Sequence, residues 1–229
     1  KNKILVLLML LIMLAPVRTM AQAPQPGADG LGDLIFPQLG NGGYDALHYT
    51  LDLAVDVASN TITGTTTMKA QATRALSAFN LDFVGFTISE IQVNDVPANY
   101  RRDEHELTII PSQPLLNGEI FTVIVRYSGV PGEGVPEEFS TDNTGWINYK
   151  DGVVVLSEPT GAAEWYPVND HPLDKATYTL RITVPELYMA VANGLQQETV
   201  ETDGATTYVW ESRYPMASYL VTVNIAELV

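Results

Sequence analysis

The chain has 229 residues, of which 46% are hydrophobic and 17% charged, a balance that allows a packed core in one large domain or two small ones. Its 27 acidic residues outnumber its 12 basic ones, and the resulting charge of −15 argues against partners such as nucleic acid or anionic membranes. The absence of cysteine excludes a disulfide framework, so the fold has to rest on its hydrophobic core.

The beginning of the chain has the pattern of a secretory signal peptide. Lys1 and Lys3 precede an apolar run over residues 4–15, and an Ala-Gln-Ala string at 21–23 offers the small residues that signal peptidase recognises. The apolar run is short for a membrane span, and a lipoprotein signal would need a cysteine, although a retained anchor stays open as the alternative. We therefore expect residues 1–23 to be removed. The mature protein would be secreted or extracytoplasmic, in the periplasm or at the cell surface, without membrane association.

The next segments predict a linker and then a long β-hairpin. Residues 24–43 are rich in Gly, Pro, Asp and Gln, which predicts a flexible linker. Apolar and polar residues alternate through Tyr44–Ala58, and the β-branched segment Thr61–Thr73 follows the turn Ser59-Asn60. The first strand should bury one face, made of Leu47, Tyr49, Leu51, Leu53, Val55 and Val57.

The rest of the chain predicts short strands separated by Asn-Gly and Asp-Gly turns, with an irregular loop at residues 129–144 and no helical period. We expect strands at Ala78–Phe83, Phe86–Val93, Glu106–Ile110, Glu119–Tyr127, Gly145–Tyr149, Val153–Leu156, Thr177–Val184, Met189–Asn193, Gln196–Glu201, Thr206–Ser212 and Ser218–Ala226. This pattern is typical of an all-β domain over residues 44–229. We expect a β-sandwich or a curved, saddle-like sheet of many short, mostly antiparallel strands.

The sequence offers no complete set of catalytic or metal-binding residues. The string His105-Glu106 resembles the start of a zinc-binding helix, but the position of the second histidine holds Ile109 and the surrounding sequence is strand-like. There is no cysteine nucleophile and no Gly-x-Ser-x-Gly string. We therefore expect neither a catalytic residue nor a metal site in this chain.

One segment, residues 157–178, differs from ordinary strand and turn sequence. Its prolines predict a rigid loop. It contains the strings Glu158-Pro159-x-Gly161-Ala162, Trp165-Tyr166-Pro167 and Asp170-x-Pro172-x-x-Lys175-Ala176-Thr177-Tyr178. These strings resemble the N-terminal domain of the aminopeptidase N family, the gluzincin zinc metallopeptidases related to leukotriene hydrolase. Weaker similarities, such as Tyr214-Pro215-Met216, extend the resemblance from about residue 44 to the end of the chain.

The resemblance implies that zinc and the hydrolytic chemistry belong to a C-terminal catalytic domain whose metal-binding strings are missing from this chain. This chain would hold no cofactor and be inactive alone. Its partners would be that catalytic domain and peptide substrates with a free N-terminus, whose α-amine Glu158 would bind. We expect structural roles for Asp170, as a cap of the turn before Pro172, and for Lys175, as the partner of a nearby acid. Two alternatives stay open: a secreted, non-catalytic β-domain used for protein–protein binding, and a bacterial surface adhesion domain.

Overall fold

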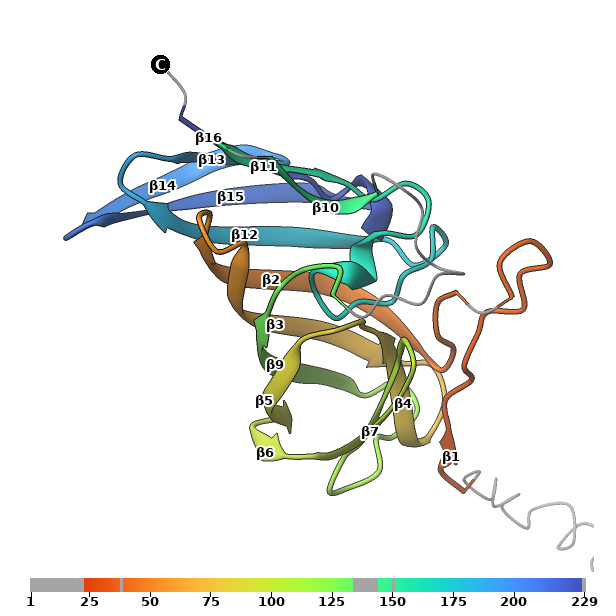
Figure 1. Ribbon diagram of the computed structural model, residues 1–229. Coiled ribbons are helices and arrows are strands. Elements are labelled where there is room, and N and C mark those ends of the chain that lie inside the picture. The colour runs from red at the N-terminus through yellow and green to blue at the C-terminus, as the bar shows by residue number, and fades with distance from the viewer. Residues whose placement is uncertain (1–22, 38, 134–143, 150, 228–229) are drawn as a thin grey trace, which may run out of the picture.

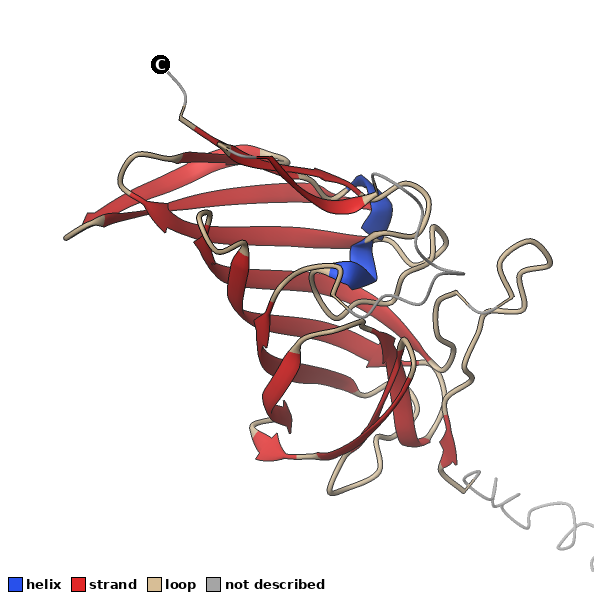
Figure 2. Cartoon of the chain, viewed as in Figure 1, coloured by secondary structure: helices blue, strands red, loops and turns tan. Residues whose placement is uncertain are grey.

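A computed structural model describes residues 23–37, 39–133, 144–149 and 151–227 of the chain. The predicted signal peptide, except residue 23, and most of the predicted loop at 129–144 lie outside these ranges. The described part is an all-β fold with two short 3-10 helices, η1 (Ala162–Glu164) and η2 (Ser218–Leu220), as Figure 2 shows. Neither helix is long or hydrophobic enough to cross a membrane.

Three sheets make up the fold (Figure 1). The largest has eight strands in the order β14 (Leu195–Thr202), β15 (Ala205–Met216), β12 (Ala176–Pro185), β2 (Tyr44–Asp56), β3 (Thr61–Ala72), β9 (Ile120–Gly129), β5 (Thr87–Val93) and β6 (Val96–Pro97). A four-stranded sheet has the order β1 (Gln25–Pro26), β4 (Leu76–Asp82), β8 (Glu106–Ile110) and β7 (Asn99–Asp103). Another has the order β10 (Gly145–Tyr149), β11 (Gly152–Leu156), β16 (Val223–Ala226) and β13 (Met189–Ala192). Strand pairs are antiparallel except β2 with β12 and β1 with β4.

The eight-stranded sheet buries one of its two faces. Along β2, Leu51 and Leu53 are buried whereas Asp52 and Ala54 are exposed. A single hydrophobic cluster joins this face to residues of both smaller sheets, among them Phe79 of β4. Full burial of one such side chain stabilises the fold by about 1.5–3 kcal/mol. Both smaller sheets therefore cover the same face, one near each end of the large sheet (Figure 1), which gives the expected sandwich-like, all-β architecture.

The predicted hairpin is confirmed, with a correction to its buried face. A β-bulge between Ala46 and His48 shifts the pairing of β2 with β3. A bulge inserts one extra residue and so moves the alternation by one position. Tyr44 and Ala46 are consequently buried before the bulge, while Leu47, which was expected in the core, is only half-buried.

Two segments differ from the predicted pattern. Residues 218–220 of the predicted last strand form η2, because the Ser218 hydroxyl donates to buried Asp170 and the chain turns there. The last strand is therefore limited to β16. The linker predicted over residues 24–43 is instead packed against the domain along part of its length. Its β1 pairs with β4, and Asn41 is fully buried.

Candidate functional site

Glu158, the predicted substrate-binding residue, lies just after β11 and is exposed to solvent. It lines a groove of about 470 Å³ together with Leu156, Tyr219 and Leu220. The first of these side chains ends β11, and the other two belong to η2, so the fold brings the segment at Glu158 together with residues near the end of the chain at one surface. The peptide bond between Glu158 and Pro159 is cis.

The backbone on either side of Glu158 is anchored in the core. Trp165 is fully buried, and its indole Nε1 donates to the Ser157 hydroxyl over 3.3 Å. The Gly161 backbone N–H donates to the Ser157 carbonyl over 2.8 Å. Tyr166 packs edge-on against Trp165, with ring centroids 4.4 Å apart, and is itself fully buried. The loop thus holds an exposed carboxylate next to buried, hydrogen-bonded residues, which is the kind of support that precise ligand positioning needs.

Gly161 is required in this loop by a close approach of two backbones. A Cβ atom at this position would lie 2.5 Å from the backbone nitrogen of Gly145 and 2.7 Å from its Cα. These atoms belong to the first residue of β10, which cannot rotate away as a flexible side chain would. The Gly in the string Glu158-Pro159-x-Gly161 is therefore explained by packing of the loop against β10.

Asp170 is structural, but through contacts other than the predicted turn cap. Its carboxylate accepts a hydrogen bond from the Ser218 hydroxyl over 2.6 Å and a longer one from the Ala163 backbone N–H over 3.4 Å. Burial raises the pKa of Asp170 to about 6. Asp170 thus ties η2, which carries Tyr219 and Leu220 of the groove, to η1. Lys175 is exposed and forms no ion pair with any residue that the structure describes, so its predicted acidic partner is not found.

The string His105-Glu106 lies away from the groove residues, at the turn into β8, where neither side chain lines the groove. Its neighbour Asp82, which comes from the end of β4, was not among the candidate residues expected from the sequence. The only sequence signal was that Asp82 lies one residue before the end of the predicted strand Ala78–Phe83 and that Glu106 begins the next predicted strand but one.

The chain matches the peptidase M1 N-terminal domain family over residues 45–220. Among curated relatives, aminopeptidase A of Gloydius brevicauda is 26% identical over 187 residues, which are 76% of this chain and 19% of the relative. Glutamyl aminopeptidase of Homo sapiens is 32% identical over 120 residues, 52% of this chain and 12% of the relative. This chain thus spans at most about a fifth of the length of these relatives.

Solved structures show the same likeness at the level of the fold. The M1 zinc metallopeptidase from Deinococcus radiodurans superposes with a TM-score of 0.78 and 33% sequence identity, covering 86% of this chain and 45% of that chain. A mutant of that enzyme bound to a Tyr-Ser-Ala substrate superposes with a TM-score of 0.79 and 32% identity, with the same coverage. The similarity therefore covers the described domain and less than half of the solved enzyme.

Proposed function

Because the chain belongs to the family of peptidase M1 N-terminal domains, we propose that it is the substrate-capping domain of a secreted zinc aminopeptidase that removes N-terminal residues from peptides. Zinc, held in a C-terminal catalytic domain, would supply the activation of water and of the scissile carbonyl. This chain would contribute substrate recognition and no catalytic residue. The aminopeptidases among its relatives and the metallopeptidase with a bound tripeptide support this assignment.

The observation that carries the proposal is the position of Glu158. An aminopeptidase has to distinguish a free α-ammonium group from a peptide bond, and the positive charge is the largest difference between them. A carboxylate can accept a charge-assisted hydrogen bond from that ammonium. Glu158 is an exposed acid on an anchored loop, at a groove whose other walls include the apolar and aromatic side chains of Leu156, Tyr219 and Leu220. Such a groove suits the first residue of a peptide, with its amine at Glu158.

The side chains that surround the groove also support the proposed capping role. Leu156 and Leu220 both line the groove and expose 55% and 49% of their surface in this domain. Apolar side chains that stay exposed next to a groove are typical of a surface completed by a partner or ligand. In the proposed enzyme, the catalytic domain and the peptide would cover them.

Glu158→Ala in the full-length protein tests the proposal. Loss of a charge-assisted hydrogen bond costs roughly 1.5–3 kcal/mol. We expect kcat/KM for peptides with a free N-terminus to fall about 10- to 150-fold, at about 1.4 kcal/mol per decade. N-acetylated peptides, which lack the ammonium, should remain poor substrates for both proteins.

The matched control is Glu201→Ala, which removes an exposed acid from the edge strand β14. It should leave kcat/KM unchanged, and circular dichroism should show both variants folded. If Glu158→Ala stays within about twofold of the wild type on free peptides, Glu158 is an ordinary loop acid and the assignment fails.

A further inference from the structure

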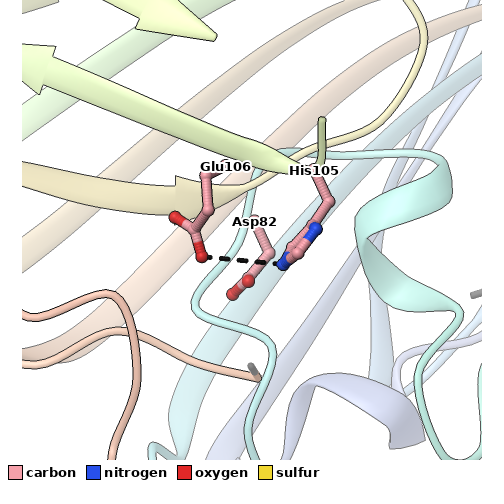
Figure 3. Close-up of side chains that lie close together, drawn as sticks. All are labelled: Asp82, His105 and Glu106. Atoms are coloured by element: carbon pink, nitrogen blue, oxygen red, sulfur yellow. Dashed lines mark ion pairs between the residues drawn. The ribbon is translucent and has the colours of Figure 1, made fainter. Parts of the chain in front are cut away.

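Three side chains that could coordinate a metal converge between β4 and the turn into β8 (Figure 3). Asp82 is the last residue of β4, His105 lies in the turn, and Glu106 is the first residue of β8. One nitrogen of His105 and one carboxylate oxygen from each acid lie within 4.8 Å of one another. His105 Nε2 is 3.7 Å from Glu106 Oε1. The antiparallel ladder places Asp82 opposite Glu106, so the backbone itself holds the two carboxylates together.

The Asp82 carboxylate has only half of its hydrogen-bonding capacity used. Its residue is 1% exposed. Its Oδ2 accepts from the Asn41 side-chain amide over 3.1 Å and from the Asp170 backbone N–H over 2.7 Å. Its Oδ1 is buried and has no hydrogen-bond partner among the residues that the structure describes. A buried carboxylate oxygen without a partner is costly, because its hydration has been lost and not replaced.

The two acids lack a basic partner within the part of the chain that the structure describes. Among the described residues, neither Asp82 nor Glu106 forms an ion pair with a lysine or arginine; the Glu106 carboxylate lies instead beside the imidazole of His105. Two carboxylates facing each other in a buried site repel unless a proton or a cation lies between them. A cation bound between the two carboxylates would therefore offset their repulsion, a role that no basic side chain of the described residues takes.

We propose that Asp82, His105 and Glu106 bind one divalent transition-metal ion, with Zn²⁺ as the best fit. One imidazole nitrogen and two carboxylate oxygens are donors that Zn²⁺ accepts, whereas Ca²⁺ and Mg²⁺ favour oxygen alone. Bonds of about 2.0–2.2 Å to zinc would bring the three ligand atoms closer together than the distances of up to 4.8 Å between them. His105 lies in a turn, where such a movement requires only a small local adjustment.

A small cavity beside the cluster has room for a water molecule as the fourth zinc ligand. It has about 20 Å³ of space and is lined by Asp82, His105, Glu164 and Asp170, among others. This is enough for a single water molecule with polar neighbours. Three protein ligands and one water complete the tetrahedral arrangement that zinc prefers.

The bound ion would act as a structural tie. It would join the end of β4 to the turn before β8, and Asp82 would connect it to the loop that follows Glu158 through the Asp170 backbone N–H. The sequence argued against a metal here because residue 109 is not a histidine. The third ligand comes instead from a neighbouring strand.

Zinc titration of the metal-free chain tests the proposal. After treatment with a chelator, calorimetry with ZnCl₂ should show one equivalent bound, and the melting temperature should rise with the zinc concentration. CaCl₂ and MgCl₂ should bind more weakly. The variants Asp82→Asn and His105→Gln should each weaken zinc binding by more than about tenfold, the smallest loss expected even for an outer-shell partner of a metal ligand.

His48→Gln is the matched control, since His48 is a half-buried histidine on β2 whose ring nitrogens are hydrogen-bonded to the hydroxyl groups of Thr177 and Thr179. It should keep the zinc affinity of the wild type. Should Asp82→Asn fail to fold by circular dichroism, His105→Gln and Glu106→Gln decide the question. The proposal is wrong if the wild-type chain binds no zinc, or if folded ligand variants bind it as well as the wild type. Neither result depends on peptidase activity, so the zinc-binding proposal is tested independently of the proposed function.

Discussion

Replacing Gly161 by alanine should destabilise the domain through one steric conflict. Gly161 has φ −89° and ψ 1°, angles that alanine adopts without difficulty, so the backbone conformation adds no cost. The new Cβ would meet the backbone nitrogen and Cα of Gly145 at 2.5 and 2.7 Å, well inside normal contact. Overpacking of this kind costs about 1–3 kcal/mol. The lower entropy of alanine in the unfolded chain offsets about 0.4–1 kcal/mol of that.

We therefore expect Gly161→Ala to lower the free energy of unfolding by roughly 1–2 kcal/mol and the melting temperature by roughly 2–8 °C. Urea unfolding can be followed by tryptophan fluorescence, because Trp146 and Trp165 lie beside the affected contact, with their ring centroids 5.9 Å apart. Thr160→Ala, which adds no atom to the same loop, is the control and should change stability by less than about 0.5 kcal/mol. A Gly161→Ala protein as stable as the wild type would show that β10 yields to the extra atom, and the packing explanation of this glycine would be refuted.

Two further predictions concern pH and processing. Burial raises the pKa of Glu164 from 4.5 to about 7, so the folded state keeps a proton that the unfolded chain releases. The contribution of Glu164 to stability should therefore be fully present below about pH 4.5 and be lost as pH rises through about 7. Urea titrations should show a smaller fall over this range in Glu164→Gln, and an unchanged fall would contradict this cause. Mass spectrometry of the exported protein should find an N-terminus at or near Pro24, whereas an intact Lys1 would mean a retained anchor.

Much of the strand pattern could be predicted from the sequence, because a strand with one buried face repeats every two residues. The predicted bounds of Glu106–Ile110 and Gly145–Tyr149 agree with β8 and β10. The hairpin of β2 and β3 was visible for the same reason, together with the turn at Ser59-Asn60. The family resemblance rested on a short loop whose residues are held by local contacts, such as Trp165 to Ser157.

Irregular features were poorly predicted where one distant contact overrides a local pattern. Ser218 was assigned to a strand, because nothing near it in sequence announces its hydrogen bond to Asp170. Residues 24–43 have the composition of a linker, yet Asn41 donates to Asp82 from a fully buried position. A local pattern reports propensity, and these polar groups are fixed by partners far away in the chain.

The sequence by itself thus determined the all-β class and most strands, and it singled out Glu158 as the candidate residue, since these depend on side-chain alternation and on a contiguous string. Only the tertiary structure decided that η2 would face Glu158 across a groove and that Asp82 would stand opposite Glu106. The physical reason is that burial and electrostatic environment belong to the packed arrangement of strands. Whether an acidic residue faces water, a hydrogen-bond donor or another acid is set when β4 and β8 pair, and no neighbour along the chain carries that information.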